Sequence, residues 1–249
     1  MALLTDGDIS SIEDLRSYDT QLLEVASIEG IDVTRKLRLA EEEIAGEVVT
    51  LLRRGVAWFQ PPVDSGRVVV TPTLKFWHTY LALEMVYRDA YCSQLNDRYA
   101  GKRDEFHERA GWAHNQVIQT GLGIANDPVA RASSPMVEAC AGGLPDGTYY
   151  VSAAWTNAGA AAGMFSTPVT IKLGGSSFSA RVGTAPGKVK GWNVYAGRGP
   201  DSLTLQNASP LALEQAWVQS NTMLTGGALA GCGQAPDYLL AVPRRIQRG

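Results

Sequence analysis

Residues 71–91, TPTLKFWHTYLALEMVYRDAY, decide the class of fold. Thr71 is a favourable N-cap, and Pro72 suits the first helical position because a backbone N–H there has no helical partner. Apolar residues then recur every three or four positions, so the stretch predicts a long helix. They form two stripes rather than one: Leu74, Trp77, Leu81 and Met85, and Phe76, Tyr80, Leu83, Tyr87 and Tyr91. A helix that is apolar on two sides is expected at the centre of a bundle.

Three further helices are predicted from the same periodicity, over residues 9–28, 32–54 and 97–120. Ser10 with Glu13 fits a capping box at the start of the first helix, and Gly30 fits the left-handed stop position after it. Gly55 is expected to end the second of these helices, and Gly121 with Gly123 the third. Four helices with short connections predict a compact helical bundle.

From residue 145 onward the hydrophobic period changes to two, which is typical of strands with one buried face. The alternating segments are residues 148–155, 169–173, 178–182 and 192–196, with shorter ones at 203–207 and 216–220. Short strands separated by turn residues predict a β-sandwich. Residues 128–144, rich in Pro, Ser, Ala and Gly, show neither period and are predicted to be a linker.

The sequence therefore predicts an α+β protein of two domains, an N-terminal four-helix bundle followed by a C-terminal β-sandwich. The expected boundaries are residues 1–127 for the helical domain, 128–144 for the linker, 145–240 for the sandwich and 241–249 for a basic tail. Charge changes along the chain as well: residues 1–144 carry 21 acidic and 14 basic side chains, and residues 145–249 carry 4 and 8. Such a break in composition favours two domains with different surroundings.

Several classes of protein are not indicated by the composition. No apolar run approaches the ~18 residues that a transmembrane helix needs, so we expect no membrane span. The first residues, MALLTD, lack the basic segment and apolar core of a signal peptide, so we expect synthesis in the cytoplasm. Cys92, Cys140 and Cys232 are scattered and odd in number, which predicts neither a disulfide framework nor a cysteine metal site.

Catalytic motifs are also missing from the sequence. His107 and His114 are seven residues apart, whereas a helical zinc site usually has two histidines four residues apart and a third ligand. The glycine-rich residues 226–233 have no GxxxxGK(S/T) pattern, and no GxSxG nucleophile motif occurs. We therefore expect no enzyme, no cofactor and no metal. A rival hypothesis, an enzyme without a recognisable motif, predicts a deep pocket lined by titratable residues with shifted pKa values.

A pattern of aromatic and charged helix positions runs through residues 77–106. It consists of Trp77-His78, Leu83, Val86-Tyr87-Arg88-Asp89-Ala90, Asn96-Asp97-Arg98-Tyr99, Lys102 and Phe106. Through this pattern, about residues 3–125 resemble the head–tail connector (adaptor) proteins of tailed bacteriophages. The resemblance implies a structural virion protein, made in the host cytoplasm, that docks as a twelve-copy ring beneath the portal and joins the capsid to the tail.

The resemblance also implies partners and a location. The ring would lie in the neck of the virion, between the portal protein and a tail or nozzle protein, and DNA would pass through its channel without specific binding. Six residues are hypothesised portal or ring contacts: Phe76, Tyr80, Tyr87, Arg244, Arg245 and Arg248. The three aromatic residues are equally consistent with core packing. The three arginines fit an arm inserted into a neighbouring protein, a solubilising end or, as a third option with little phosphate neutralisation, a nucleic-acid contact.

The second half of the chain carries a resemblance of its own. Residues 191–197, GWNVYAG, and 147–157, GTYYVSAAWTN, are similar to strands of fibronectin type III and immunoglobulin-like modules. That resemblance, over about residues 145–240, implies a sandwich that braces the ring or contacts the capsid or a tail fibre. The alternative function is a virion or surface binding protein whose sandwich recognises a protein or a glycan. Glycan recognition predicts an exposed aromatic platform, formed by Tyr150, Trp192 or Trp217.

Overall fold

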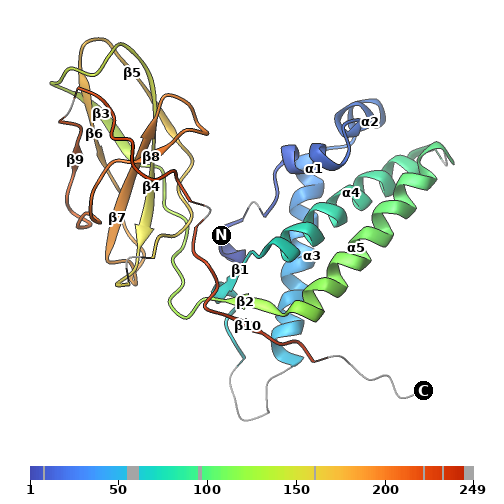
Figure 1. Cartoon of the computed structure of the whole chain (residues 1–249). Coiled ribbons are helices and arrows are strands. Elements are labelled where there is room, and N and C mark those ends of the chain that lie inside the picture. Colours follow the sequence, from blue (N-terminus) through green and yellow to red (C-terminus); the bar gives the residue numbers. More distant parts are fainter. Residues whose placement is uncertain are drawn as a thin grey trace. The chain divides into compact units, whose positions relative to one another are not determined.

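The computed structural model describes residues 1–7, 9–54, 62–94, 97–159, 161–220, 222–231 and 233–243 (Figure 1). These residues form both helices and sheets, which confirms the α+β class. The chain divides into two compact units. The β unit comprises Met1–Asp6 and Asn126–Ala235, and the helical unit comprises Gly7–Ala125 and Pro236–Gly249.

The helical unit holds the α-helices of the described residues: α1 (Ile12–Tyr18), α2 (Leu22–Glu29), α3 (Val33–Arg54), α4 (Pro72–Gln94) and α5 (Ala100–Thr120). The helix predicted over residues 9–28 is in fact two helices, with a break at Asp19. The Asp19 N–H donates to Leu15 O, while its carboxylate accepts the N–H of Gln21, so Asp19 ends α1 and leads into α2. The predicted capping box is wrong by one residue, because the observed box is formed by Ser11 and Asp14.

The three long helices lie where the sequence predicts them. Asp32 Oδ1 accepts the N–H of Arg35 at the start of α3, and Thr71 Oγ1 accepts the N–H of Leu74 at the start of α4. The helix α4 packs against both α3 and α5, and runs alongside α5 (Figure 1). The expected stop at Gly55 lies outside the described residues. None of the helices in the described ranges combines the length and apolarity that crossing a membrane requires.

A small antiparallel sheet of order β1-β2-β10 belongs to the helical unit: β1 (Val68–Val69), β2 (Leu122–Ile124) and β10 (Tyr238–Leu240). Leu240 pairs with Leu122, just after Gly121 ends α5. The chain thus leaves the helical unit after Ala125 and returns to it at Pro236. These units differ from the expected boundaries in two places. Residues 236–240, expected in the sandwich, belong to the helical unit, and residues 1–6, expected in the helical domain, belong to the β unit.

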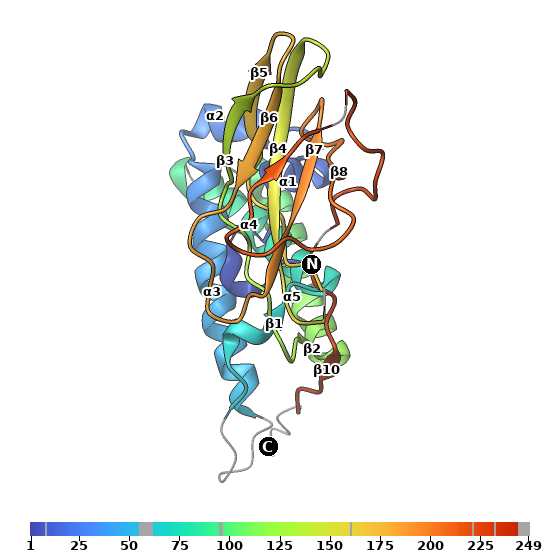
Figure 2. The ribbon, with the colours of Figure 1, turned by 90° about the vertical axis from the view of Figure 1, so that its left-hand side faces the viewer.

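The β unit contains two sheets. One has the strand order β3-β6-β9: β3 (Met136–Cys140), β6 (Ser177–Arg181) and β9 (Trp217–Val218). The other has the order β5-β4-β7-β8: β5 (Val169–Leu173), β4 (Gly147–Thr156), β7 (Gly191–Gly197) and β8 (Thr204–Leu205), with the long β4 and β7 side by side (Figure 2). Strand β3 lies in the segment predicted to be a linker. It is an edge strand with no fully buried side chain, so its sequence lacks the alternating pattern of a strand.

Both sheets of the β unit contribute to one core. Trp155 on β4 and Trp192 on β7 are register partners, and both are buried with Phe178 from β6. The indole N–H of Trp192 donates to Ala212 O at 3.0 Å, so the ring is buried without an unpaired donor. Burial of one large apolar side chain contributes about 1.5–3 kcal/mol, so these rings are a main source of stability for the β unit.

Candidate functional site

A cluster of aromatic side chains on the helical unit is the candidate functional site. It joins three helices through Tyr80 on α4. The ring of Tyr18 on α1 meets Tyr80 edge-on at 5.1 Å between centroids, and Phe76 stacks on Tyr80 at 6.4 Å. The guanidinium of Arg109 on α5 lies 5.7 Å from the Tyr80 centroid. Trp112 follows Arg109 by three residues and so lies on the same side of α5. We call these five residues the aromatic face.

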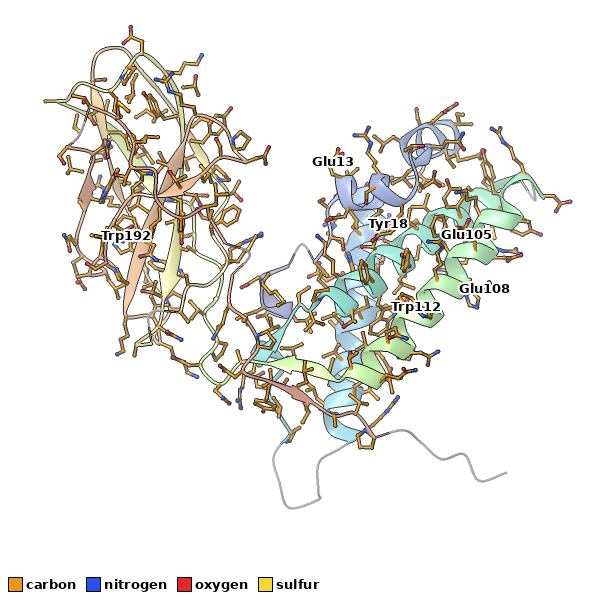
Figure 3. All side chains as sticks on the ribbon, in the orientation of Figure 1. Glu13, Tyr18, Glu105, Glu108, Trp112 and Trp192 are labelled. Atoms are coloured by element: carbon orange, nitrogen blue, oxygen red, sulfur yellow. The ribbon has the colours of Figure 1, made fainter. Side chains whose placement is uncertain are left out.

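The aromatic face is partly open to solvent. Trp112 is 53% exposed, Tyr18 38% and Phe76 36%, whereas Tyr80 beneath them is 7% exposed. Figure 3 labels Trp112 and Tyr18 together with three carboxylates, Glu13, Glu105 and Glu108, on the same two helices. Exposed apolar side chains that gather in one place, rather than singly, are characteristic of interaction sites.

Charged side chains surround the aromatic face. Arg109 pairs with Glu105 one turn earlier on α5 at 2.9 Å, and Lys75 on α4 pairs with Asp14 on α1 at 2.8 Å. Burial by itself raises the pKa of Asp14, but hydrogen bonds from Lys75 and Ser11 outweigh it and hold that pKa below its usual value. An apolar centre within a charged rim is the usual anatomy of a protein–protein contact.

The structure brings together only some of the residues hypothesised as contacts. Phe76 and Tyr80 belong to the aromatic face, Phe76 exposed and Tyr80 below it. Tyr87 is 1% exposed, so the core alternative is correct for this residue. Arg244, Arg245 and Arg248 lie outside the described residues.

Three members of the aromatic face, Tyr18, Arg109 and Trp112, were missed by the sequence reasoning. Trp112 falls outside the apolar stripe of α5, whose buried members are Phe106, Ala110, Ala113 and Val117. An indole away from the buried stripe is a signal that could have been used, because it predicts an exposed ring. Tyr18 gives no such signal, since its exposure depends on the break of the helix at Asp19.

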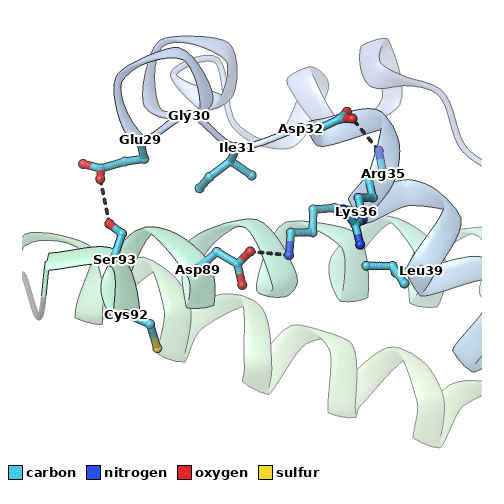
Figure 4. Close-up of a pocket in the computed structure, with 10 residues that line it drawn as sticks. All are labelled: Glu29, Gly30, Ile31, Asp32, Arg35, Lys36, Leu39, Asp89, Cys92 and Ser93. Carbon is cyan, nitrogen blue, oxygen red and sulfur yellow. Dashed lines mark hydrogen bonds and ion pairs between the residues drawn. The ribbon is translucent and has the colours of Figure 1, made fainter.

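A hollow of about 630 Å³ lies between the start of α3 and the end of α4 (Figure 4). Four of its five charged side chains bond within the chain, among them Asp32, which accepts the backbone N–H of Arg35. Lys36 forms an ion pair with Asp89, and the hydroxyl of Ser93 donates to Glu29 at 2.8 Å. These contacts hold the α2–α3 turn on α4. Cys92 lines the same hollow as a free thiol.

The three histidines lie in different surroundings. His78 is buried and its Nε2 lies 3.0 Å from Leu37 O. His107 pairs with Glu84 at 3.0 Å. The ring of His114 packs on Trp77 at 4.6 Å between centroids. Within the described ranges, no three His, Cys, Asp or Glu side chains come together in a way that could hold a metal ion.

The aromatic platform expected for glycan recognition is not present at Trp192. That ring is completely buried in the core of the β unit. Trp217 is partly buried and packs on Phe178 at 5.5 Å, and Tyr150 is partly buried against a second apolar cluster. Trp192 is therefore a core residue, and Trp217 and Tyr150 pack against the edges of apolar clusters.

Comparison with protein-family models, with curated proteins and with solved structures gives no significant match to this chain.

Proposed function

We propose that this chain is a non-enzymatic structural protein of a tailed bacteriophage, an adaptor whose copies form a ring between the portal and the tail. The observation that carries the proposal is the aromatic face, where Trp112, Tyr18 and Phe76 each keep a third or more of their surface exposed. Trp and Tyr are enriched among the residues that contribute most to protein–protein binding. An exposed cluster of this kind fits a chain that acts through contact with other proteins.

The residues that carry the resemblance to connectors support the same proposal. Trp77, Tyr87 and Phe106 are buried where α4 packs against α5. The pattern therefore reflects the packing of these two helices, and the same two helices present most of the aromatic face. By analogy with connectors, the ring has twelve copies in the neck of the virion and leaves a channel for DNA, and its head-to-tail interface closes by rotation.

In this proposal the two compact units are two domains, a connector-type helical bundle and a β-sandwich. The order β5-β4-β7-β8 supports an immunoglobulin-like sandwich, because strands C′, C, F and G of such modules are neighbours in the same order. Trp155 on β4 then takes the place of the buried Trp of strand C. Strand β9 departs from the pattern, since it follows β8 in the chain but pairs with β6.

Exposed apolar side chains on the β unit favour a protein as the partner of the sandwich. Met223 and Leu229 are 70% and 68% exposed. The capsid or a tail fibre fits such a surface better than a glycan does, because glycans pack on flat aromatic rings and Trp192 is buried. Met223→Asp combined with Leu229→Asp is expected to abolish capsid or fibre binding in a pull-down while leaving portal binding intact.

Negative-stain electron microscopy of the chain mixed with portal rings tests the adaptor proposal. We expect an added layer of density beneath the portal, with the symmetry of the ring. Trp112→Ala is expected to remove the layer without changing the thermal midpoint. Ile28→Ala, which truncates a 59% exposed apolar residue on α2, is the matched control and is expected to leave the layer in place. Portals that stay undecorated at low and at high salt would overturn the proposal.

A further inference from the structure

A groove of about 360 Å³ lies between α3, α4 and α5. Its floor is apolar, formed by the nearly buried Trp77 and Leu81 of α4 and Ala110 of α5. Gly111 leaves one wall open, because a Cβ built on it would meet no atom within 4 Å. The α5 residues of the groove recur at three and four positions and lie on a different side of the helix from Trp112.

The rim of the groove is acidic. It carries Glu43 and Glu47 from α3 and Glu84 from α4, and no Lys or Arg is among the described residues that line it. Glu47 is paired with Arg54 outside the lining at 2.9 Å, and Glu84 with His107 at 3.0 Å. Glu43 is exposed and forms no ion pair within the described ranges. The groove thus offers an apolar floor between carboxylates, which suits an extended basic segment that contains an apolar side chain.

We propose that this groove binds the last residues of the chain itself, 244–249, Arg-Arg-Ile-Gln-Arg-Gly. The basic segment complements the acidic rim, where Glu43 has no ion pair within the described ranges, and Ile246 supplies an apolar side chain for the floor at Trp77. The inference concerns the single chain and does not depend on the adaptor function.

Strand β10 ends close to the C-terminal end of α5, the helix that forms one side of the groove. Leu240 pairs with Leu122, just beyond the end of α5. At about 1.5 Å per residue along the helix, His114 lies about 12 Å and His107 about 22 Å from Leu122. Residues 241–248 span up to about 26–29 Å when extended, so they are long enough to follow α5 from His114 to His107. His114 lines the end of the groove that is nearer to β10, and its Nε2 is buried without a hydrogen-bond partner within the described part of the chain.

Fluorescence anisotropy of a labelled peptide of residues 241–249 tests the assignment, with a chain truncated after Pro243 as the receptor. We expect saturable binding that weakens as salt screens the charges. Glu43→Lys is expected to weaken binding at least about tenfold. Glu42→Lys makes the same charge change on the neighbouring α3 residue, which does not line the groove, and is expected to leave the affinity unchanged. A peptide with all three arginines replaced by glutamine is expected not to bind.

The full chain supplies the decisive comparison. Its own last residues occupy the groove at high effective concentration, so the labelled peptide is expected to bind the full chain at least about tenfold more weakly than the truncated one. Equal affinity for both chains, or equal losses in Glu43→Lys and Glu42→Lys, would overturn the proposal. A full chain that sediments as an oligomer, beside a monomeric truncated chain, would place the segment in a neighbouring copy and overturn the intramolecular assignment.

Discussion

The hydroxyl of Tyr87, at the centre of α4, donates a hydrogen bond to the buried carboxylate of Asp19, at the break between α1 and α2. The other carboxylate oxygen, Oδ1, accepts the N–H of Gln21, and the Lys102 ammonium on α5 lies 3.5 Å from Oδ2, the oxygen that Tyr87 bonds. Burial, followed by the Asp19 hydrogen bond, raises the pKa of Tyr87, so its hydroxyl stays protonated and remains a donor. This one carboxylate therefore ties the turn between two short helices to the central helix.

Tyr87→Phe is expected to lower the free energy of unfolding by about 1–3 kcal/mol, because it leaves a buried carboxylate without one of its donors. Urea denaturation measures the loss. Tyr238→Phe removes a hydroxyl from a 39% exposed ring on β10 and is expected to change stability very little. Equal stabilities of Tyr87→Phe and the original chain would show that the hydrogen bond contributes nothing.

Acid is expected to destabilise the chain through His78. Leu37 O only accepts, so Nε2 of His78 is the donor, and its buried Nδ1 has no partner in the described part of the chain. Protonation would leave a buried N–H without an acceptor, and burial accordingly lowers the pKa of His78. The unfolded state then binds more protons than the folded state below about pH 6.5, so the free energy of unfolding falls as pH falls.

Urea unfolding at neutral pH and at about pH 5 measures this slope. His78→Gln is expected to flatten it, because glutamine can still donate to Leu37 O but does not titrate. Burial also lowers the pKa of His114, so His114→Gln is expected to flatten the slope further in the double variant. A double variant with the same acid sensitivity as the original chain would contradict the assignment to these two histidines.

Gly121→Ala is expected to destabilise the helical unit by about 1–3 kcal/mol. Gly121 has φ +90°, and a Cβ there would lie 2.5 Å from Leu240 O, so strand β10 would have to move. Hydrogen exchange of the β10 amides, from Tyr238 to Leu240, reports the displacement directly. Gly101→Ala on α5 meets no atom and is expected to be neutral or to stabilise by about 0.5–1 kcal/mol. Unchanged protection of β10 in Gly121→Ala would refute the close approach.

Trp192→Phe is expected to cost the chain about 1–3 kcal/mol, because it leaves a void in the core and removes the indole hydrogen bond to Ala212 O. Trp217→Phe, in a partly buried ring at the edge of the same core, is expected to cost less. Thermal unfolding followed by near-UV circular dichroism compares the two. If Trp192→Phe kept full stability but lost binding to a glycan array, the ring would be a recognition residue after all.

Local signals were enough to predict the three long helices, because caps and periodicity depend on residues within a few turns. The Thr71–Leu74 cap is an example. The same signals failed at residues 9–28, where Asp19 interrupts a continuous apolar stripe. Asp19 is held in place by Tyr87 and Lys102, which lie far along the chain, so no local pattern reveals the break.

The candidate site was predicted only in part for a similar reason. Phe76, Tyr80 and Tyr87 share one stripe in the sequence, yet Phe76 is exposed and Tyr87 is fully buried. Periodicity gives the side of the helix on which a residue lies. It does not give the depth of the residue, which depends on the helices that cover that side.

By itself, the sequence determined the three long helices, the strands with an alternating pattern and where the charge balance changes, because backbone preference and hydrophobic period are local properties. Only the tertiary structure decided that residues 238–240 pair with β2 and that Trp192 points into a core. It also decided that Tyr18 and Arg109 meet the ring of Tyr80. Each of these depends on partners far apart in the chain, and such pairings are selected by the burial and hydrogen bonding of the whole fold rather than by neighbouring residues.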